Sequence, residues 1–240
     1  MLDSETARTA LPKDKHHEVL LPLKPKATRL RDRGTIPCHY HLGQANPIVK
    51  HHHTGTNMES LTLPHFPSNA LLLGLFTQVS NASFLRQQLL DGNSAFEYAF
   101  LDASVLLSRS HILAAVFRSL TDAQANRLKS RNVHSEIVFD LSPNNNIAES
   151  FRRFGIQDST RNLVAVKVLG EARVEEVEAH LRANVQGEVR ELTDEALAEV
   201  RDEARIRKVY RVEQPKKGEI GVLSKEAEAF VLGSMALKGS

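Results

Sequence analysis

The stretch Lys129–Ile156, KSRNVHSEIVFDLSPNNNIAESFRRFGI, most constrains how this chain of 240 residues can fold. Apolar residues alternate with more polar ones along Val133–Leu141, and this period of two predicts a strand. Proline and asparagine follow at residues 142–145, where they break the strand and favour a turn. The stretch therefore predicts a strand followed by a tight turn.

A short helix is predicted after that turn. Asn146 is placed to cap it, with Glu149 three residues on to complete a capping box, and Gly155 supplies a left-handed stop. Two large aromatic residues, Phe151 and Phe154, share one face of this helix. Either both rings pin the helix to its sheet, or one faces outward as an anchor for a partner.

Strand and helix patterns alternate through the middle of the chain. Strands are expected at Ala70–Val79, Phe96–Leu101 and Asn162–Leu169. Helices are expected to begin at Asn81 (or Ser80), Ser108 (or Ser110), Thr193 and Ser224, and an amphipathic helix is expected at Arg173–Ala183. The helix after Thr193 should run to Arg211, before a polar loop at Gln214–Gly221. We predict one α/β domain, a small mixed β-sheet covered by helices, with a C-terminal helical cluster.

Residues 1–57 differ in composition from the rest. They hold none of the 10 phenylalanines, but five of the nine prolines and seven of the 11 histidines. We expect a disordered, dispensable extension at 1–57 and a folded domain at 58–240, with Met58 as an alternative start of the chain. The run His51-His52-His53 makes a poor fixed metal site without a fold around it.

The cysteine count, the length of the apolar runs and the net charge exclude several classes of protein. The single Cys38 excludes an intramolecular disulfide and favours a reducing compartment. No apolar run approaches the ~20 residues of a membrane span, so we expect no membrane association. Residues 1–57 carry a net charge of +4 and the remainder −2, so a nucleic-acid contact must come from a local patch. One such basic region lies at 103–135, and a mainly acidic region follows at 171–203.

We find no constellation that indicates catalysis, a metal or a cofactor. Glycine-rich phosphate loops, H-E-x-x-H and G-x-S-x-G are missing. Ser135, His134 and Asp140 form a conceivable triad, but neighbouring residues of a strand point to opposite faces. The asparagines at 144–146 are interpreted as a turn with a helix cap rather than an anion site. A stand-alone RNA-binding module and an unrecognised hydrolase or transferase stay open as alternatives.

Several segments taken together resemble one family. They are LLLGLFTQVSNASFLRQQL, FEYAFLDASVLLSRSHILAAVFRSL, SRNVHSE with SPNNNIAESFRRFGI, and EARIRKVYRV. In this order they are similar to the kinase-binding subunit of the KEOPS/EKC complex, and most of all to its fungal form. The resemblance runs from about residue 63 to residue 238, and residues 1–57 have no counterpart in it.

The resemblance implies a non-catalytic subunit without a cofactor. It implies docking on the small lobe of an atypical kinase/ATPase, which in turn binds the transferase subunit of the complex. It further implies help in recruiting tRNA by its 3′ CCA end, for threonylcarbamoyl modification of the adenosine beside the anticodon. A link to telomere maintenance and a place in nucleus and cytoplasm come with the family.

The resemblance also suggests which residues make these contacts. For kinase binding they are the residues of the short helix and its end: Ile147, Phe151, Phe154 and Ile156. Phe154 is expected to be the exposed anchor of that contact. For tRNA binding they are basic or polar residues at two element starts: Arg109, His111, Lys129 and Arg131.

Overall fold

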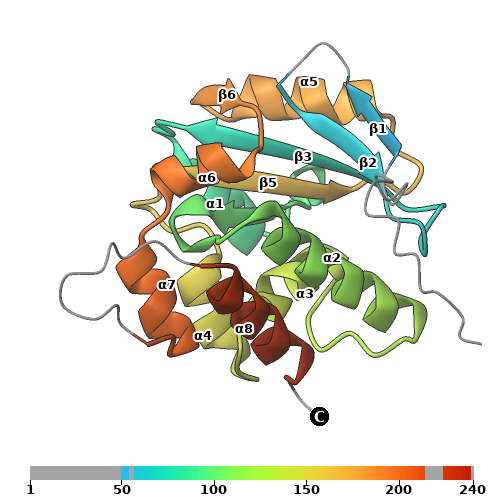
Figure 1. Ribbon diagram of the computed structural model, residues 1–240. Helices are drawn as coiled ribbons and strands as arrows, with labels where there is room; N and C mark the ends of the chain where they lie inside the picture. Colours follow the sequence, from blue (N-terminus) through green and yellow to red (C-terminus); the bar gives the residue numbers. More distant parts are fainter. Residues whose placement is uncertain (1–49, 54–56, 214–223, 239–240) are drawn as a thin grey trace, which may run out of the picture. The chain divides into compact units, whose positions relative to one another are not determined.

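The sheet is centred on strand β3, which pairs on both sides and is almost wholly buried. The computed structural model describes residues 50–53, 57–213 and 224–238. The strand order is β1-β2-β3-β5-β4, with β6 also paired to β3. Strands β1, β2, β3 and β5 can be followed in Figure 1. The strands are β1 (Lys50–His53), β2 (Glu59–Thr62), β3 (Ala70–Thr77), β4 (Ala99–Asp102), β5 (Leu163–Val168) and β6 (Glu188–Arg190). The α/β class is confirmed, but every pair between these strands is antiparallel, where we expected a mixed sheet.

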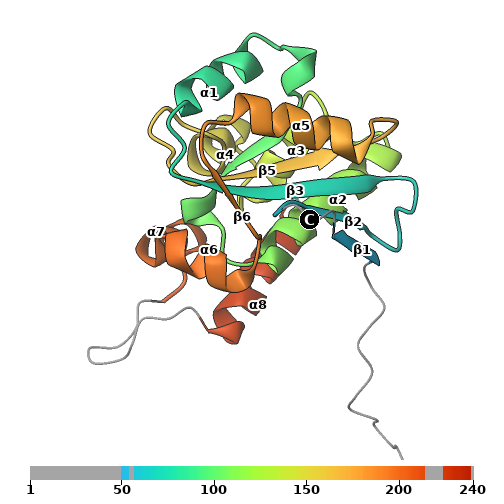
Figure 2. The same cartoon turned by 90° about the horizontal axis from the view of Figure 1, so that it is seen from above.

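Helices cover both faces of the sheet (Figure 2). They are α1 (Ala82–Leu90), α2 (Arg109–Gln124), α3 (Val133–Asp140), α4 (Ile147–Phe154), α5 (Val174–Asn184), α6 (Asp194–Val200), α7 (Glu203–Tyr210) and α8 (Lys225–Ala236). Leu71, Leu73 and Leu75 pack with α2, α3, α7 and α8, whereas Leu72 and Phe76 pack with α1 and α5. A strand covered on both faces needs apolar residues at consecutive positions, which explains the run in β3.

The prediction of a strand at Val133–Leu141 is wrong, because this segment forms helix α3. Asn132 caps it by accepting a hydrogen bond from the Ser135 N–H at 2.9 Å. The helix packs against α2, α4, β4 and β5, so most of its side chains are buried, including Glu136 and Asp140. A helix buried nearly all round shows no polar face, and its apparent alternation was therefore misleading.

Gly155 ends α4 for a different reason than expected. Its φ is −74°, so the expected left-handed stop is wrong. A Cβ at this position would lie 2.7 Å from the Phe151 carbonyl oxygen, closer than a Cβ atom can approach. Glycine is required because the backbone passes too close to the preceding turn.

The single helix expected from Thr193 to Arg211 is divided in two. Arg201 is extended, and its neighbour Asp202 caps α7 by accepting from the Arg205 N–H at 2.9 Å. The Asp202 N–H donates to the Ser104 carbonyl at 2.7 Å, which ties the break to the core. A second capping residue within a helical pattern was the signal for this break.

Two further segments differ from the expectation. Strand β1 lies inside the segment 1–57, so the expected disorder does not hold for its four residues, and the rest of 1–56 lies outside the described residues. The strand expected at Phe96–Leu101 begins only at Ala99, after a 3₁₀ turn at Ser94–Phe96. The predicted loop Gln214–Gly221 lies outside the described residues. Among the helices of the described residues, none combines the length and the apolar character that a membrane span requires.

Candidate functional site

Helix α4 begins as its sequence predicts. Asn146 accepts a hydrogen bond from the Glu149 N–H at 3.0 Å, and Asn144 accepts from the Asn146 N–H at 3.1 Å. The asparagine run is therefore a turn with a helix cap, as we interpreted it. In place of the second half of a capping box, Glu149 accepts from the Asn144 amide at 3.4 Å.

The four residues expected to bind the kinase differ in accessibility. Phe154 is 0% exposed, with its ring edge-on to His111 and Tyr210, at centroid distances of 6.5 Å and 6.0 Å. The expectation that Phe154 is an exposed anchor is therefore wrong, because its ring fills the core below the sheet. Ile156 is also buried, whereas Ile147 is 39% exposed and Phe151 is half-buried.

The four residues expected to bind tRNA also divide into two pairs. His111 is 0% exposed and is held between the Leu107 N–H and the Tyr210 hydroxyl. Arg109 donates to both carboxylate oxygens of Glu59 at 2.6 Å. The expectation that these two face RNA is wrong for His111, and Arg109 is already engaged in an ion pair. Lys129 and Arg131 are exposed.

A cavity of about 500 Å³ lies between α1, α3 and α4. Its walls are mostly apolar and include four aromatic rings, those of Phe96, Tyr98, Phe100 and Phe151. The sequence analysis missed this cavity, because its walls come from segments that are far apart in the chain. Apolar clefts with a few polar groups are the usual place for a ligand.

Three arginines, Arg86, Arg131 and Arg152, line this cavity, against one carboxylate, Glu97. Among the described residues Arg131 forms no ion pair, and its guanidinium lies against Gly92, where a Cβ would be 2.8 Å from Nη1. With other described residues, Arg86 and Arg152 form only long ion pairs near the surface, at 3.4 Å and 3.5 Å. Such exposed pairs hold a side chain weakly, so all three guanidinium groups are available to an anionic ligand. We name this feature the arginine pocket.

His134 lies in the wall of the arginine pocket. Its Nε2 accepts a hydrogen bond from the Val168 N–H at 3.1 Å, so the ring hydrogen is on Nδ1. Burial, with a smaller contribution from Lys167, lowers the pKa of His134 to about 3 and keeps the ring neutral. Among the described residues Nδ1 has no hydrogen-bond partner. His134 is not linked to Ser135 and Asp140 as a triad requires, because Asp140 is bonded to Ser119 instead.

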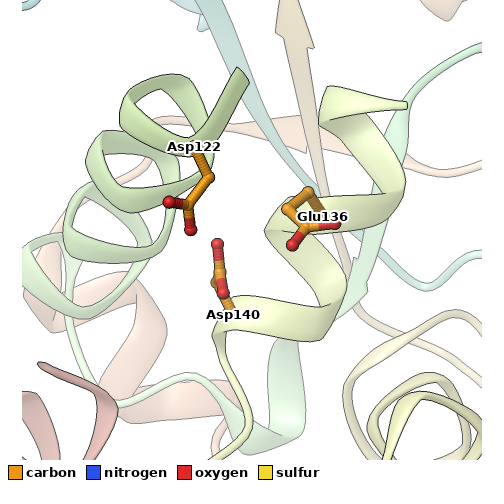
Figure 3. Close-up of side chains that lie close together, drawn as sticks. All are labelled: Asp122, Glu136 and Asp140. Atoms are coloured by element: carbon orange, nitrogen blue, oxygen red, sulfur yellow. The ribbon is translucent and has the colours of Figure 1, made fainter. Parts of the chain in front are cut away.

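Three carboxylates, Asp122 on α2 and Glu136 and Asp140 on α3, lie within 4.8 Å of one another (Figure 3). Glu136 accepts from the backbone N–H groups of residues 129 and 130 and from the Ser130 hydroxyl. Asp140 lies close to two cations, Arg118 at 3.5 Å and Lys238 at 3.7 Å. These cations already neutralise most of the negative charge, so the cluster does not need a metal ion.

Two buried histidines make stability depend on pH. Burial lowers the pKa of His111 to about 3, like that of His134, whereas an exposed histidine has a pKa of 6.5. Below pH 6.5 the unfolded chain therefore binds more protons at these two histidines than the folded chain does. Asp140 acts in the opposite direction, because burial raises its pKa from 3.8 to about 6. Because two histidines outweigh one carboxyl group, the folded state loses stability on acidification.

We therefore expect the free energy of unfolding to fall by about 1.4 kcal/mol for each pH unit between about pH 6 and pH 4. Urea unfolding followed by circular dichroism at several pH values in this range measures it. Asp140→Asn, which removes the opposing group, should make the fall steeper. A midpoint that stays constant or rises on acidification contradicts this assignment.

Comparison with known proteins gives one family. The family model "Kinase binding protein CGI-121" matches residues 76–239. This range includes the helices α1 to α8 and the strands β4 to β6. The match therefore includes the arginine pocket and helix α4.

Fungal proteins are similar over nearly their whole length. The "EKC/KEOPS complex subunit cgi121" of Aspergillus fumigatus is 48% identical over 189 residues, which cover 76% of this chain and 97% of that protein. The protein of the same name from Coccidioides immitis is 44% identical, with 76% and 98% covered. That of Schizosaccharomyces pombe is 31% identical, with 75% and 99% covered.

Proposed function

Because this chain belongs to the kinase binding protein CGI-121 family, we propose that it is the kinase-binding subunit of an EKC/KEOPS complex. One observation carries this proposal: the chain matches relatives bearing that name over almost their full length, at up to 48% identity. The kinase partner is the atypical kinase/ATPase, and the transferase subunit is reached through it. In this reading the chain works by binding and has no catalysis of its own.

We place the kinase contact on the exposed side of α4. Ile147 is 39% exposed, and the half-buried Phe151 follows one turn later on the same side of the helix. Apolar side chains that reach the surface side by side are the usual centre of a protein interface. Phe154 and Ile156 then support this face from below and do not touch the partner.

The kinase contact gives a direct test with full-length protein. Ile147→Glu is expected to weaken kinase binding by about 2 kcal/mol or more, roughly thirtyfold in Kd, because it places a charge in the apolar centre of the contact. Co-purification and calorimetric titration with the cognate kinase measure the loss. Phe84→Glu on α1, at an apolar residue of similar exposure, 44%, is the matched control and should bind normally. Equal effects of the two variants would remove the contact from α4.

We further propose that the chain recruits tRNA by its 3′ CCA end for threonylcarbamoyl modification beside the anticodon. The arginine pocket supports this proposal. Its mostly apolar walls suit an unpaired base, and Arg86, Arg131 and Arg152 suit the phosphates. Lys129 is exposed two residues before Arg131 and extends the positive charge beyond the pocket. Arg109 and His111 are left out, because one is paired and the other is buried.

Family membership is also the basis for proposing where the protein acts. The complex is expected in both nucleus and cytoplasm, with a link to telomere maintenance. Imaging of the tagged full-length protein tests the first, and telomere length in cells that carry the Ile147→Glu variant tests whether the second depends on the kinase contact.

A further inference from the structure

The C-terminal segment, residues 224–238, is fastened to the domain at its last turn. We call this segment the C-terminal strap. Arg118 of α2 donates to the carbonyls of Met235 and Lys238, both at 2.6 Å, and to that of Ala236 at 3.3 Å. These are the carbonyls that a helix end leaves without partners inside the helix, so Arg118 caps α8 from outside.

Lys238 turns back into the domain beside this cap. Its side chain is 0% exposed, which is rare for a lysine. The ammonium donates to the Phe139 carbonyl, lies 3.1 Å from the centroid of the Phe139 ring and is 3.7 Å from Asp140 Oδ1. The ammonium thus has one hydrogen bond to a carbonyl, one cation–π contact with a ring face and one ion pair with a carboxylate. We call these three groups of Phe139 and Asp140 the ammonium niche.

Groups outside the strap also hold the niche. Asp140 Oδ2 accepts from the Ser119 hydroxyl at 2.8 Å, which orients the carboxylate. Phe139 and Asp140 are both on α3, and α3 packs on α2. The α2–α3 pair therefore positions the groups of the niche.

We propose that the ammonium niche is a binding site for a primary alkylammonium group, and that Lys238 is its resident ligand and holds the C-terminal strap in place. A metal ion fits the niche poorly, because hard cations take oxygen ligands and one wall is an aromatic ring. A guanidinium is planar and wider than the compact ammonium that sits over the ring. The chemistry thus selects a primary ammonium.

The free-energy cost of burying the charges of Lys238 and Asp140 agrees with a role in positioning the strap. Burial lowers the pKa of Lys238 to about 8 and raises that of Asp140 to about 6, although each faces the opposite charge. The other charged groups that face this pair are Arg118, Asp122, Glu136 and Lys129. A buried pair whose members both resist charging contributes little net stability, so its effect is to fix where the strap lies.

Hydrogen exchange on the full chain near neutral pH tests the proposal. Lys238→Ala is expected to speed the exchange of backbone amides in 225–236 on the order of tenfold, because the strap keeps its contact with Arg118 but loses the buried ammonium. Millimolar n-propylammonium, which supplies the missing carbons and the ammonium, should restore protection, whereas n-propanol should not. Lys225→Ala, at an exposed lysine of the same helix, is the matched control and should exchange like the wild type.

Unchanged exchange in Lys238→Ala overturns the proposal, as does equal restoration by n-propanol. If the alanine variant does not fold, Lys238→Met keeps an unbranched apolar side chain and lacks the ammonium with its charge and donors. Protection of 225–236 at the wild-type level in that variant overturns the proposal too. The readout needs neither kinase nor RNA, so its result is separate from that of the proposed function.

Discussion

Phe154→Glu is expected to unfold the domain rather than merely to release the kinase. The Phe154 ring is 0% exposed and packs among His111, Tyr210 and the apolar core that β3 shares with α2 and α3. Removing such a ring costs about 3–5 kcal/mol, and a buried unpaired carboxylate adds several more. This approaches the ~5–15 kcal/mol by which a domain of ordinary stability is folded.

Urea unfolding followed by circular dichroism measures this effect. Phe154→Leu is the matched control, because it keeps most of the apolar volume and should lose far less stability. Ile147→Glu should unfold at the same urea concentration as the wild type, since its side chain reaches solvent. A Phe154→Glu protein that is folded at the wild-type midpoint but does not bind kinase would show that this ring contacts the partner after all.

Reversing two charges of the arginine pocket is expected to lower affinity for tRNA by roughly tenfold to a hundredfold. Arg131→Glu with Arg152→Glu removes two cations from the cavity wall and leaves the apolar walls intact. Both side chains are exposed, so the fold should not suffer. The salt dependence of binding should also become shallower, by about 0.7 in slope for each lost phosphate contact with a single strand.

Binding titrations at several salt concentrations measure both effects. Arg173→Glu with Lys208→Glu changes the net charge equally at exposed sites outside the pocket, and should reduce affinity much less. A tRNA that lacks its 3′-terminal nucleotides should bind the wild type as weakly as intact tRNA binds the pocket variant. If the control variant loses as much affinity as the pocket variant, binding depends on overall charge and not on this cavity.

The sequence predicted those parts of the fold that local signals specify. The apolar runs of β3 and β5 were recognised, and the caps Ser108, Asn146 and Ser224 all accept the expected backbone hydrogen bonds. Helix α3 was mistaken for a strand because burial on all sides removes the polar face by which a helix is recognised. Local patterns therefore failed where tertiary packing determines the environment of a segment.

The site was harder to predict than the fold for the same reason. Whether Phe154 points to a partner or to the core depends on His111 and Tyr210, which come from two other helices. The arginines of the pocket come from α1, from the loop before α3 and from α4, and no spacing in the sequence brings them together. Charge counts did indicate a basic region, but they could not separate Arg109, which is paired with Glu59, from Arg131, which forms no ion pair with the part of the chain that the structure describes.

The position of β3 has a consequence for how the chain is made. Its principal partner, β5, follows only after α1, β4, α2, α3 and α4 have been synthesised. Until then a nascent β3 presents an apolar segment with unpaired backbone groups on one edge, a state that invites aggregation. Binding of chaperones to the nascent chain should therefore matter most while the segment between β3 and β5 is being translated.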